Sequence, residues 1–297
     1  MLLLLACLSP QEPSVSDSNV EPTPAPRTLE PGSHTLESDG LERSFELYYP
    51  ENLPENAALV LAFHGYGGSA TGLQGYSGLD AVAEREGFVV AYPQGVTDRS
   101  GNPYWEVGYA FHNGEVDDVG LALDLVALLQ ADLGTDPERV YATGMSNGGD
   151  MSYQLACQAG DTFSAVAPVA GCLMGVVQDS CTATQTSLME IHGTQDTTTP
   201  WAGDPDGSDG WGPYLGTQES VGHFVDVYGL GAPVVEELPD LSESDGSQVR
   251  LYQWGSGALQ VRLYEVQGGK HDWPGAGGNQ DIDSAEEIWS FFEEVHE

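Results

Sequence analysis

Short apolar runs alternate with segments of helical periodicity over most of this chain, and the alternation limits the folds that it can adopt. The runs AALVLAFHG (57–65), FVVAYP (88–93), RVYATG (139–144) and FSAVAPVAG (163–171) have the length and residue types of buried strands. Segments between them, such as 116–134 and 147–160, have the period of a helix. Buried strands separated by helices predict an α/β fold with a mainly parallel central sheet and helices on both faces.

The same pattern sets the expected extent of the folded part. It becomes regular near residue 35, with a strand at RSFELYYP (43–50), and continues through the strand SLMEIHG (187–193). Two further strands, 249–254 and 260–266, precede a closing amphipathic helix at 283–297. Asp117 or Asp118 is the expected N-cap of the helix at 116–134. We therefore expect one α/β domain over residues 35–297.

The first 34 residues have a different character. The opening MLLLLACLSP is far shorter than the roughly 20 apolar residues of a membrane span. It resembles the end of a bacterial lipoprotein signal, with Leu4, Leu5 and Ala6 before Cys7, so residues 1–7 are predicted to be a signal remnant. Lipidation of Cys7 and a plain secretory signal are the two alternatives, and both predict a secreted or cell-surface protein. Residues 8–34 are rich in Pro, Ser and Glu and predict a disordered tether.

The charge of the chain excludes some partners. It has 46 acidic against 8 basic residues, a net charge of −38. Such a field repels phosphate, so we expect no nucleic-acid partner, and membrane attachment only through a lipidated Cys7. A solvated acidic surface suited to salt-rich surroundings is the simplest interpretation, and a site for a basic ligand is the alternative. The chain is expected to be a monomer.

The cysteines and acidic clusters give little sign of a metal or cofactor. In an exported protein, two of Cys157, Cys172 and Cys181 should be joined, although spacing does not say which. No Cys-x-x-Cys or Cys/His cluster is present, which argues against zinc. The aspartates Asp204, Asp206 and Asp209 could bind Ca²⁺ but do not complete an EF-hand loop. We expect an exposed acidic turn there, no metal and no cofactor.

One serine lies where chemistry is expected. In GMSNGGDMS (144–152), Ser146 stands between a β-branched strand and a helix in the pattern Gly-x-Ser-x-Gly. This is the context of a nucleophile elbow, a sharp turn that lifts the serine hydroxyl clear of the sheet at a helix N-terminus. Gly144 and Gly148 would be required because side chains there would clash. A glycine-rich loop with no catalytic role is the alternative, since the pattern alone is weak.

A serine nucleophile needs a base and an acid to orient it. Of seven histidines, His271 alone lies in a loop after the last strand, in GGKHDWPGAGG. Asp196 follows the end of a strand in IHGTQDTTTP. The chain order Ser146, Asp196, His271 is the order of an α/β-hydrolase triad.

The developing oxyanion needs backbone N–H donors. One donor is expected from Asn147, directly after the nucleophile. The second is expected from Tyr66 in HGYGGS, where Gly67 and Gly68 allow a close approach of the backbone. A flexible turn is the alternative for this loop.

Taken together with WEVGYAFHNGEVDDVGLALDLV, these motifs resemble the secreted polyhydroxybutyrate depolymerase-like esterases, which are related to feruloyl and acetylxylan esterases and have the α/β-hydrolase fold. The resemblance covers about residues 35 to 296. It implies Ser146, Asp196 and His271 as the triad and the Tyr66 region as the oxyanion loop. It also favours Cys157–Cys181 as the disulfide. Finally, it implies substrate-binding tryptophans near the cleft, for which core packing is the alternative: Trp105, Trp201 and Trp273.

The function that the resemblance implies is an extracellular serine esterase. It would hydrolyse hydroxyalkanoate oligomers or polyesters, or feruloyl and acetyl esters of polysaccharide, through an acyl-enzyme. An acyltransferase on the same scaffold and a non-catalytic binding protein are the alternatives, because fold does not fix function. No polymer-binding module is recognisable, which favours short esters over crystalline polymer.

Overall fold

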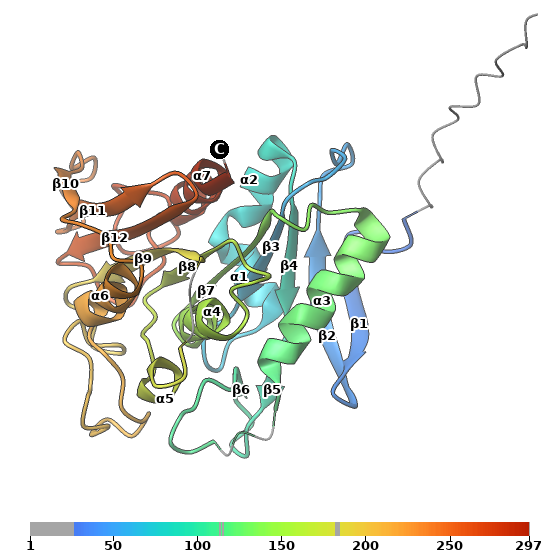
Figure 1. Cartoon of the computed structure of the whole chain (residues 1–297), viewed down its shortest axis with the longest axis horizontal. Coiled ribbons are helices and arrows are strands. Elements are labelled where there is room, and N and C mark those ends of the chain that lie inside the picture. Colours follow the sequence, from blue (N-terminus) through green and yellow to red (C-terminus); the bar gives the residue numbers. More distant parts are fainter. Residues whose placement is uncertain (1–26, 113, 115, 182–184, 297) are drawn as a thin grey trace, which may run out of the picture.

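Six parallel strands form the centre of one ten-stranded sheet in the computed structural model, which describes residues 27–112, 114, 116–181 and 185–296 (Figure 1). The strand order is β1-β2-β4-β3-β7-β8-β9-β12-β11-β10, and the strands at both ends are antiparallel to their neighbours. The strands of the large sheet are β1 (Gly32–Ser38), β2 (Leu41–Tyr48), β3 (Leu59–Phe63), β4 (Val89–Pro93), β7 (Val140–Met145), β8 (Ala165–Val169), β9 (Ser187–Gly193), β10 (Val234–Glu237), β11 (Gln248–Ser256) and β12 (Leu259–Gln267).

The inner strands are apolar throughout because both faces of the sheet are covered. Helices α3, α4 and α6 pack on one face and α1, α2 and α7 on the other, each with its own buried cluster (Figure 1). The predicted mainly parallel sheet with helices on both faces is therefore confirmed. The helices are α1 (Ala70–Ser77), α2 (Leu79–Glu86), α3 (Asp118–Leu133), α4 (Asn147–Gln158), α5 (Gly175–Gln178), α6 (Thr217–Val227) and α7 (Ser284–His296). A small separate ribbon pairs β5 (Val96–Thr97) with β6 (Pro103–Tyr104).

The two acids at the start of α3 have different roles. Asp117 is the N-cap, and its carboxylate accepts a hydrogen bond from the N–H of Gly120 at 2.7 Å. Asp118 is buried and forms an ion pair with Arg43 of β2 at 2.8 Å. This pair holds the start of α3 against the second strand from one edge of the sheet.

The folded part begins earlier than residue 35. Strand β1 starts at Gly32 and pairs with β2 along its whole length. Ahead of it, the N–H of Leu29 donates to Asp132 of α3 at 2.9 Å, and the carbonyl of Leu29 accepts from the Tyr49 hydroxyl at 2.8 Å. The predicted tether boundary at residue 34 is therefore too late, because the exposed polar residues of β1 have the composition of a linker. The predicted signal remnant, Cys7 and residues 8–26 lie outside the described residues.

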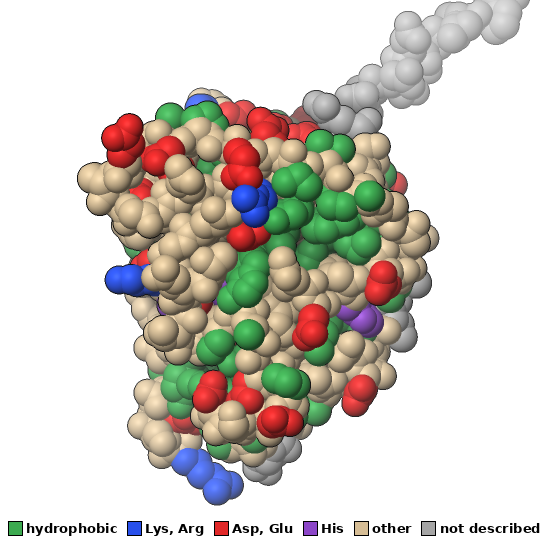
Figure 2. Space-filling view, turned by 90° about the vertical axis from the view of Figure 1, so that its left-hand side faces the viewer, with side chains coloured by type: hydrophobic (Ala, Val, Ile, Leu, Met, Phe, Trp, Pro, Cys, Tyr) green, Lys and Arg blue, Asp and Glu red, His purple; other side chains and the backbone are tan. Residues whose placement is uncertain are grey.

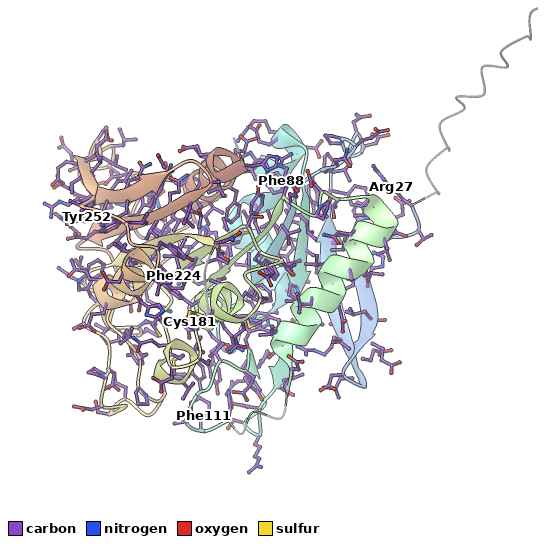
Figure 3. The ribbon with its side chains drawn as sticks, viewed as in Figure 1. Arg27, Phe88, Phe111, Cys181, Phe224 and Tyr252 are labelled. Atoms are coloured by element: carbon purple, nitrogen blue, oxygen red, sulfur yellow. A yellow bond between two sulfur atoms is a disulfide. The ribbon has the colours of Figure 1, made fainter. Side chains whose placement is uncertain are left out.

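A disulfide joins Cys157, near the end of α4, to Cys181, which follows α5 (Figure 3). This is the pairing that the family resemblance favours, and Cys172 is a free, buried thiol. Closing a loop of 24 residues contributes about 3 kcal/mol in the chain-entropy account. Within the described ranges, no helix combines the length and the apolar character that crossing a bilayer requires.

Candidate active site

Ser146 lies on a sharp turn between β7 and α4, at the carboxyl end of a central parallel strand. Its φ of 58° and ψ of −121° are a strained conformation for a residue with a side chain. A Cβ on Gly148 would lie 1.9 Å from the carbonyl oxygen of Phe63, and one on Gly144 would lie 2.5 Å from the Gly148 backbone. Glycine at both positions lets α4 and β3 approach each other this closely, which is the structural reason for the motif around Ser146.

Asp196 and His271 follow two strands that are neighbours in the sheet, β9 and β12. The Nδ1 atom of His271 lies 2.6 Å from Oδ2 of Asp196. Because an ionised carboxylate only accepts hydrogen bonds, Nδ1 carries the proton and Nε2 is left as a base. Chain segments far apart in the sequence thus bring an acid and a base together.

The environment of Asp196 keeps its carboxylate ionised. Its Oδ1 accepts hydrogen bonds from the backbone N–H of Thr198 at 2.7 Å and of Thr199 at 2.9 Å. Burial alone would raise the pKa of Asp196, but the hydrogen bonds from His271 and Thr199 outweigh it, and the pKa lies below its ordinary value. A fixed negative charge therefore faces the imidazole.

Ser146 and His271 both line one pocket of about 260 Å³. Among the described residues, no hydrogen bond joins the Ser146 hydroxyl to the His271 ring. Catalytic hydrogen bonds are often long in enzymes without substrate and shorten in the complex. Aromatic rings and small polar groups form the rest of the wall: Tyr66, Tyr109, Asp150, Cys172, Met174, Thr198, Thr199, Trp211 and Tyr214.

Two backbone N–H groups at the pocket are available as donors. Those of Tyr66 and Asn147 have no acceptor within the described part of the chain. Asn147 begins α4, where the helix dipole adds positive potential. Its side chain also bonds the backbone of Trp105 in both directions, at 2.8 and 3.2 Å. The adjacent loop is held by the N–H of Gly67, which donates to Pro103 at 2.8 Å.

The three predicted substrate-binding tryptophans do not line this pocket. Trp105 is fully buried behind it, where its indole N–H donates to His64 at 2.8 Å. Trp273 is 4% exposed and donates to Ser77 near α1 on the other face of the sheet. The ring of Trp201 lies 5.9 Å from that of His192. Trp105 and Trp273 are therefore core residues, which is the alternative that the sequence analysis gives for them.

The tryptophan of the pocket is Trp211, and sequence reasoning missed it. Trp211 and Tyr214 belong to the segment 202–216, whose three aspartates are its most conspicuous feature in the sequence. There, Asp204 accepts from the Ser208 hydroxyl at 3.0 Å and from the Asp209 N–H at 2.7 Å, so the acid closes a turn. The position of Trp211 in a Gly-rich acidic loop was the signal that could have identified it as part of the pocket wall. In the described ranges, no cluster of side chains is suited to hold a metal ion.

A second histidine and carboxylate lie beneath Asp196. The Nδ1 atom of His192 is 2.8 Å from Glu190, and its Nε2 is 2.9 Å from the Thr199 carbonyl and 3.5 Å from Asp196. Neither side chain is exposed, and the second carboxylate oxygen of Glu190 has no partner in the described structure. Burial raises the pKa of Glu190 to about 7, although His192 counteracts part of the effect.

Comparison with known proteins gives one consistent result. A family profile described as "Esterase PHB depolymerase" matches residues 43–198. A protein of Nocardia uniformis subsp. tsuyamanensis named as an esterase, NocK, is 30% identical over 75% of this chain and 67% of its own length. Poly(3-hydroxyalkanoate) depolymerase C of Paucimonas lemoignei is 28% identical over 78% of this chain, and the match spans only 60% of the depolymerase. The acetyl xylan esterase from Aspergillus awamori has the same fold, with a TM-score of 0.64 over 88% of this chain and 99% of that one, at 20% identity.

Proposed function

This chain belongs to the polyhydroxybutyrate depolymerase esterase family and is a carboxylic ester hydrolase of the α/β-hydrolase fold, and from this premise we propose that Ser146, His271 and Asp196 are its catalytic triad. The observation that carries the proposal is the 2.6 Å contact of His271 with Asp196 at a pocket that Ser146 also lines. Asp196 holds the imidazole in the tautomer whose Nε2 can accept a proton.

The reaction proceeds through an acyl-enzyme in two steps. The Oγ atom of Ser146 attacks the ester carbonyl while Nε2 of His271 takes its proton, and the N–H groups of Tyr66 and Asn147 bind the oxyanion. The alcohol leaves with the proton from His271. Water, deprotonated by His271, then attacks the acyl-enzyme and releases the acid and Ser146.

The size of the pocket supports short acyl groups as substrates. A space of about 260 Å³ walled by aromatic rings accommodates a short chain or a ring better than a long flexible acyl tail. Hydroxyalkanoate oligomers and acetyl esters are the substrate classes that the names of the depolymerase and of the acetyl xylan esterase suggest. We expect a higher kcat/KM for p-nitrophenyl acetate and butyrate than for the palmitate.

Export is the second part of the proposal. The disulfide between Cys157 and Cys181 supports an oxidising compartment, where such bonds form and persist. Attachment through Cys7 is one form that export could take. Globomycin, which blocks the lipoprotein signal peptidase, would leave a protein with lipidated Cys7 unprocessed, and a secreted one processed as usual.

A fluorophosphonate probe tests the triad. It should label the wild type at Ser146 and fail to label Ser146→Ala, whose esterase activity should fall by about 10⁴ or more. His271→Ala should be similarly inactive. His223→Ala is the matched control, because His223 lies on α6 outside the pocket, and it should keep most of its activity. Labelling at another serine, or full activity in Ser146→Ala, would overturn the assignment.

A further inference from the structure

A buried carboxylate forms part of the pocket wall and has no role in the triad. Asp150 lies in the first turn of α4, four residues after Ser146, and is 4% exposed. Ser146 precedes the helix, with φ of 58° and ψ of −121°, and its side chain and that of Asp150 line the same pocket of about 260 Å³. A short acyl chain attached to Ser146 can therefore reach Asp150.

The carboxylate of Asp150 is held in place and still has capacity to bind. Its Oδ1 accepts from the Cys172 N–H at 2.8 Å, and its Oδ2 accepts from the Tyr109 hydroxyl at 2.6 Å. An ionised carboxylate offers about four acceptor positions, and these two hydrogen bonds together with one from the Cys172 thiol use at most three of them. Burial raises the pKa of Asp150 to about 6, partly offset by these hydrogen bonds, and the group is ionised at pH 8.

Among the described residues, no lysine or arginine lines the pocket, and His271 is the one base in its wall. The wall consists mainly of the aromatic rings Tyr66, Tyr109, Trp211 and Tyr214, with Met174 and Cys172. The hydroxyl of Tyr214 is buried and has no hydrogen-bond partner in the described structure. A charged acceptor and an unused hydroxyl thus lie in one apolar pocket, where an additional hydrogen bond to an ionised acceptor is strong.

We propose that Asp150 is a specificity determinant that selects esters whose short acyl chain carries a hydrogen-bond donor. The donor, a hydroxyl or an ammonium group, bonds to the free acceptor position of Asp150, and the Tyr214 hydroxyl bonds to the same group. An acyl chain with a carboxylate is rejected, because it would place two negative charges in a pocket with little solvent. The inference rests on the proposed function, since it requires the acyl group to be bound at Ser146.

Three ethyl esters of nearly equal shape test the proposal: the 3-hydroxybutyrate, the 3-aminobutyrate as its ammonium form, and the 3-methylbutyrate, which has no donor. Hydrolysis is followed at pH 8 by titration of the released acid, and the quantity measured is the ratio of kcat/KM for each donor ester to that for the methyl ester. In the wild type this ratio should be at least tenfold for the hydroxyl or the ammonium ester.

Two variants separate recognition from structural support. Asp150→Asn keeps the shape of the side chain but removes its charge, and the ratio should fall at least tenfold for the ammonium ester and less for the hydroxyl ester. Tyr109→Phe removes a hydrogen bond to Asp150 but keeps the carboxylate, and the ratio should remain. If Asp150 only supports the loops at Tyr109 and Cys172, all three esters would slow equally in both variants.

The outcomes distinguish this inference from the proposed function. A preference for only one of the two donor esters identifies the group that the pocket binds and supports the inference. Hydrolysis of all three esters at equal rates by an enzyme labelled at Ser146 overturns the role of Asp150 and leaves the triad intact. Failure to label Ser146 and to hydrolyse any ester overturns both.

Discussion

At the scale of single residues, Glu190 is the acid whose burial has the clearest consequence for stability. Burial raises its pKa from 4.5 to about 7, so the folded protein holds a proton that the unfolded chain loses in this window. The free energy of unfolding therefore falls as pH rises from about 4.5 to 7. The shift corresponds to about 3 kcal/mol, at 1.36 kcal/mol for each pKa unit.

Glu190→Gln should remove most of this pH dependence, because the amide does not titrate and can still accept from His192. Urea unfolding at pH 5 and pH 7.5 measures the difference, which should be smaller in the variant by about 2 kcal/mol. Glu243→Gln, at an exposed position, is the control and should follow the wild type. Equal pH dependence in both variants would contradict the prediction.

The place of a residue could be predicted where the strand before it determines that place. It could not be predicted where it depends on the direction in which the side chain points. Ser146, Asp196 and His271 stand directly after predicted strands, and parallel strands end at one edge of the sheet. Whether an indole points into a pocket or into the core depends on the rotamer and on the packing of distant elements. Trp105 and Trp211 differ in this respect, and in the sequence only the Gly-rich acidic loop around Trp211 distinguishes them.

At the scale of elements, the close contact of α4 with β3 fixes the position of Ser146. In Gly148→Ala the added methyl group would meet the Phe63 carbonyl at 1.9 Å, so α4 must move away from the sheet. We expect fluorophosphonate labelling of Ser146 to slow by about 10²-fold or more, because displacements of about 1 Å in an active site have effects of this size. Stability should fall by about 1–3 kcal/mol.

Gly222→Ala in α6 is the matched control for this substitution. No atom lies within 4 Å of the position that its Cβ would occupy. The variant should be more stable by about 0.5–1 kcal/mol and should be labelled at the wild-type rate. Similar labelling rates in the two variants would show that Gly148 does not control the position of Ser146.

Elements with a clear hydrophobic pattern were predicted, and elements without one were missed. Strand β10 is exposed at every position, and β1 is largely polar, so neither has a hydrophobic pattern that indicates a strand. Helix α1, ATGLQGYS, contains two glycines and has little helical propensity. Its Ser69 cap, which accepts from the Gly72 N–H at 3.1 Å, was the one local signal of its start.

At the scale of the whole molecule, the dominant property is the net charge of −38. On the face that Figure 2 shows, acidic side chains are spread among apolar and neutral ones, and basic side chains are few. The folded state therefore repels itself, and salt screens this repulsion over a Debye length of about 10 Å at 0.1 M.

The melting temperature should accordingly rise between low salt and about 1 M NaCl. The few exposed ion pairs, such as Arg85 with Glu286 at 2.5 Å, weaken in salt but contribute little. Differential scanning calorimetry at constant pH across this range measures the effect. A constant or falling melting temperature would contradict the role of self-repulsion.

The fold as a whole was accessible from the sequence because its hydrophobic pattern is strong and continuous. The six parallel strands consist mainly of apolar residues, and helices cover both faces of the sheet that they form. The start of the domain was less accessible. It depends on contacts of Leu29 with Asp132 and Tyr49, which are distant in the chain and leave no periodic pattern.

The segment 202–216 supplies Trp211 and Tyr214 to the pocket, but none of the three residues proposed as the triad. β-Bridges join Tyr214 to Asp204 within the segment and to Met174 outside it, so the backbone of the segment is held on two sides. Mutations within it can accumulate, or a related gene can replace it by recombination, while the bond-breaking centre stays as it is. Part of the substrate preference can therefore change in evolution without a change in the residues proposed as the triad.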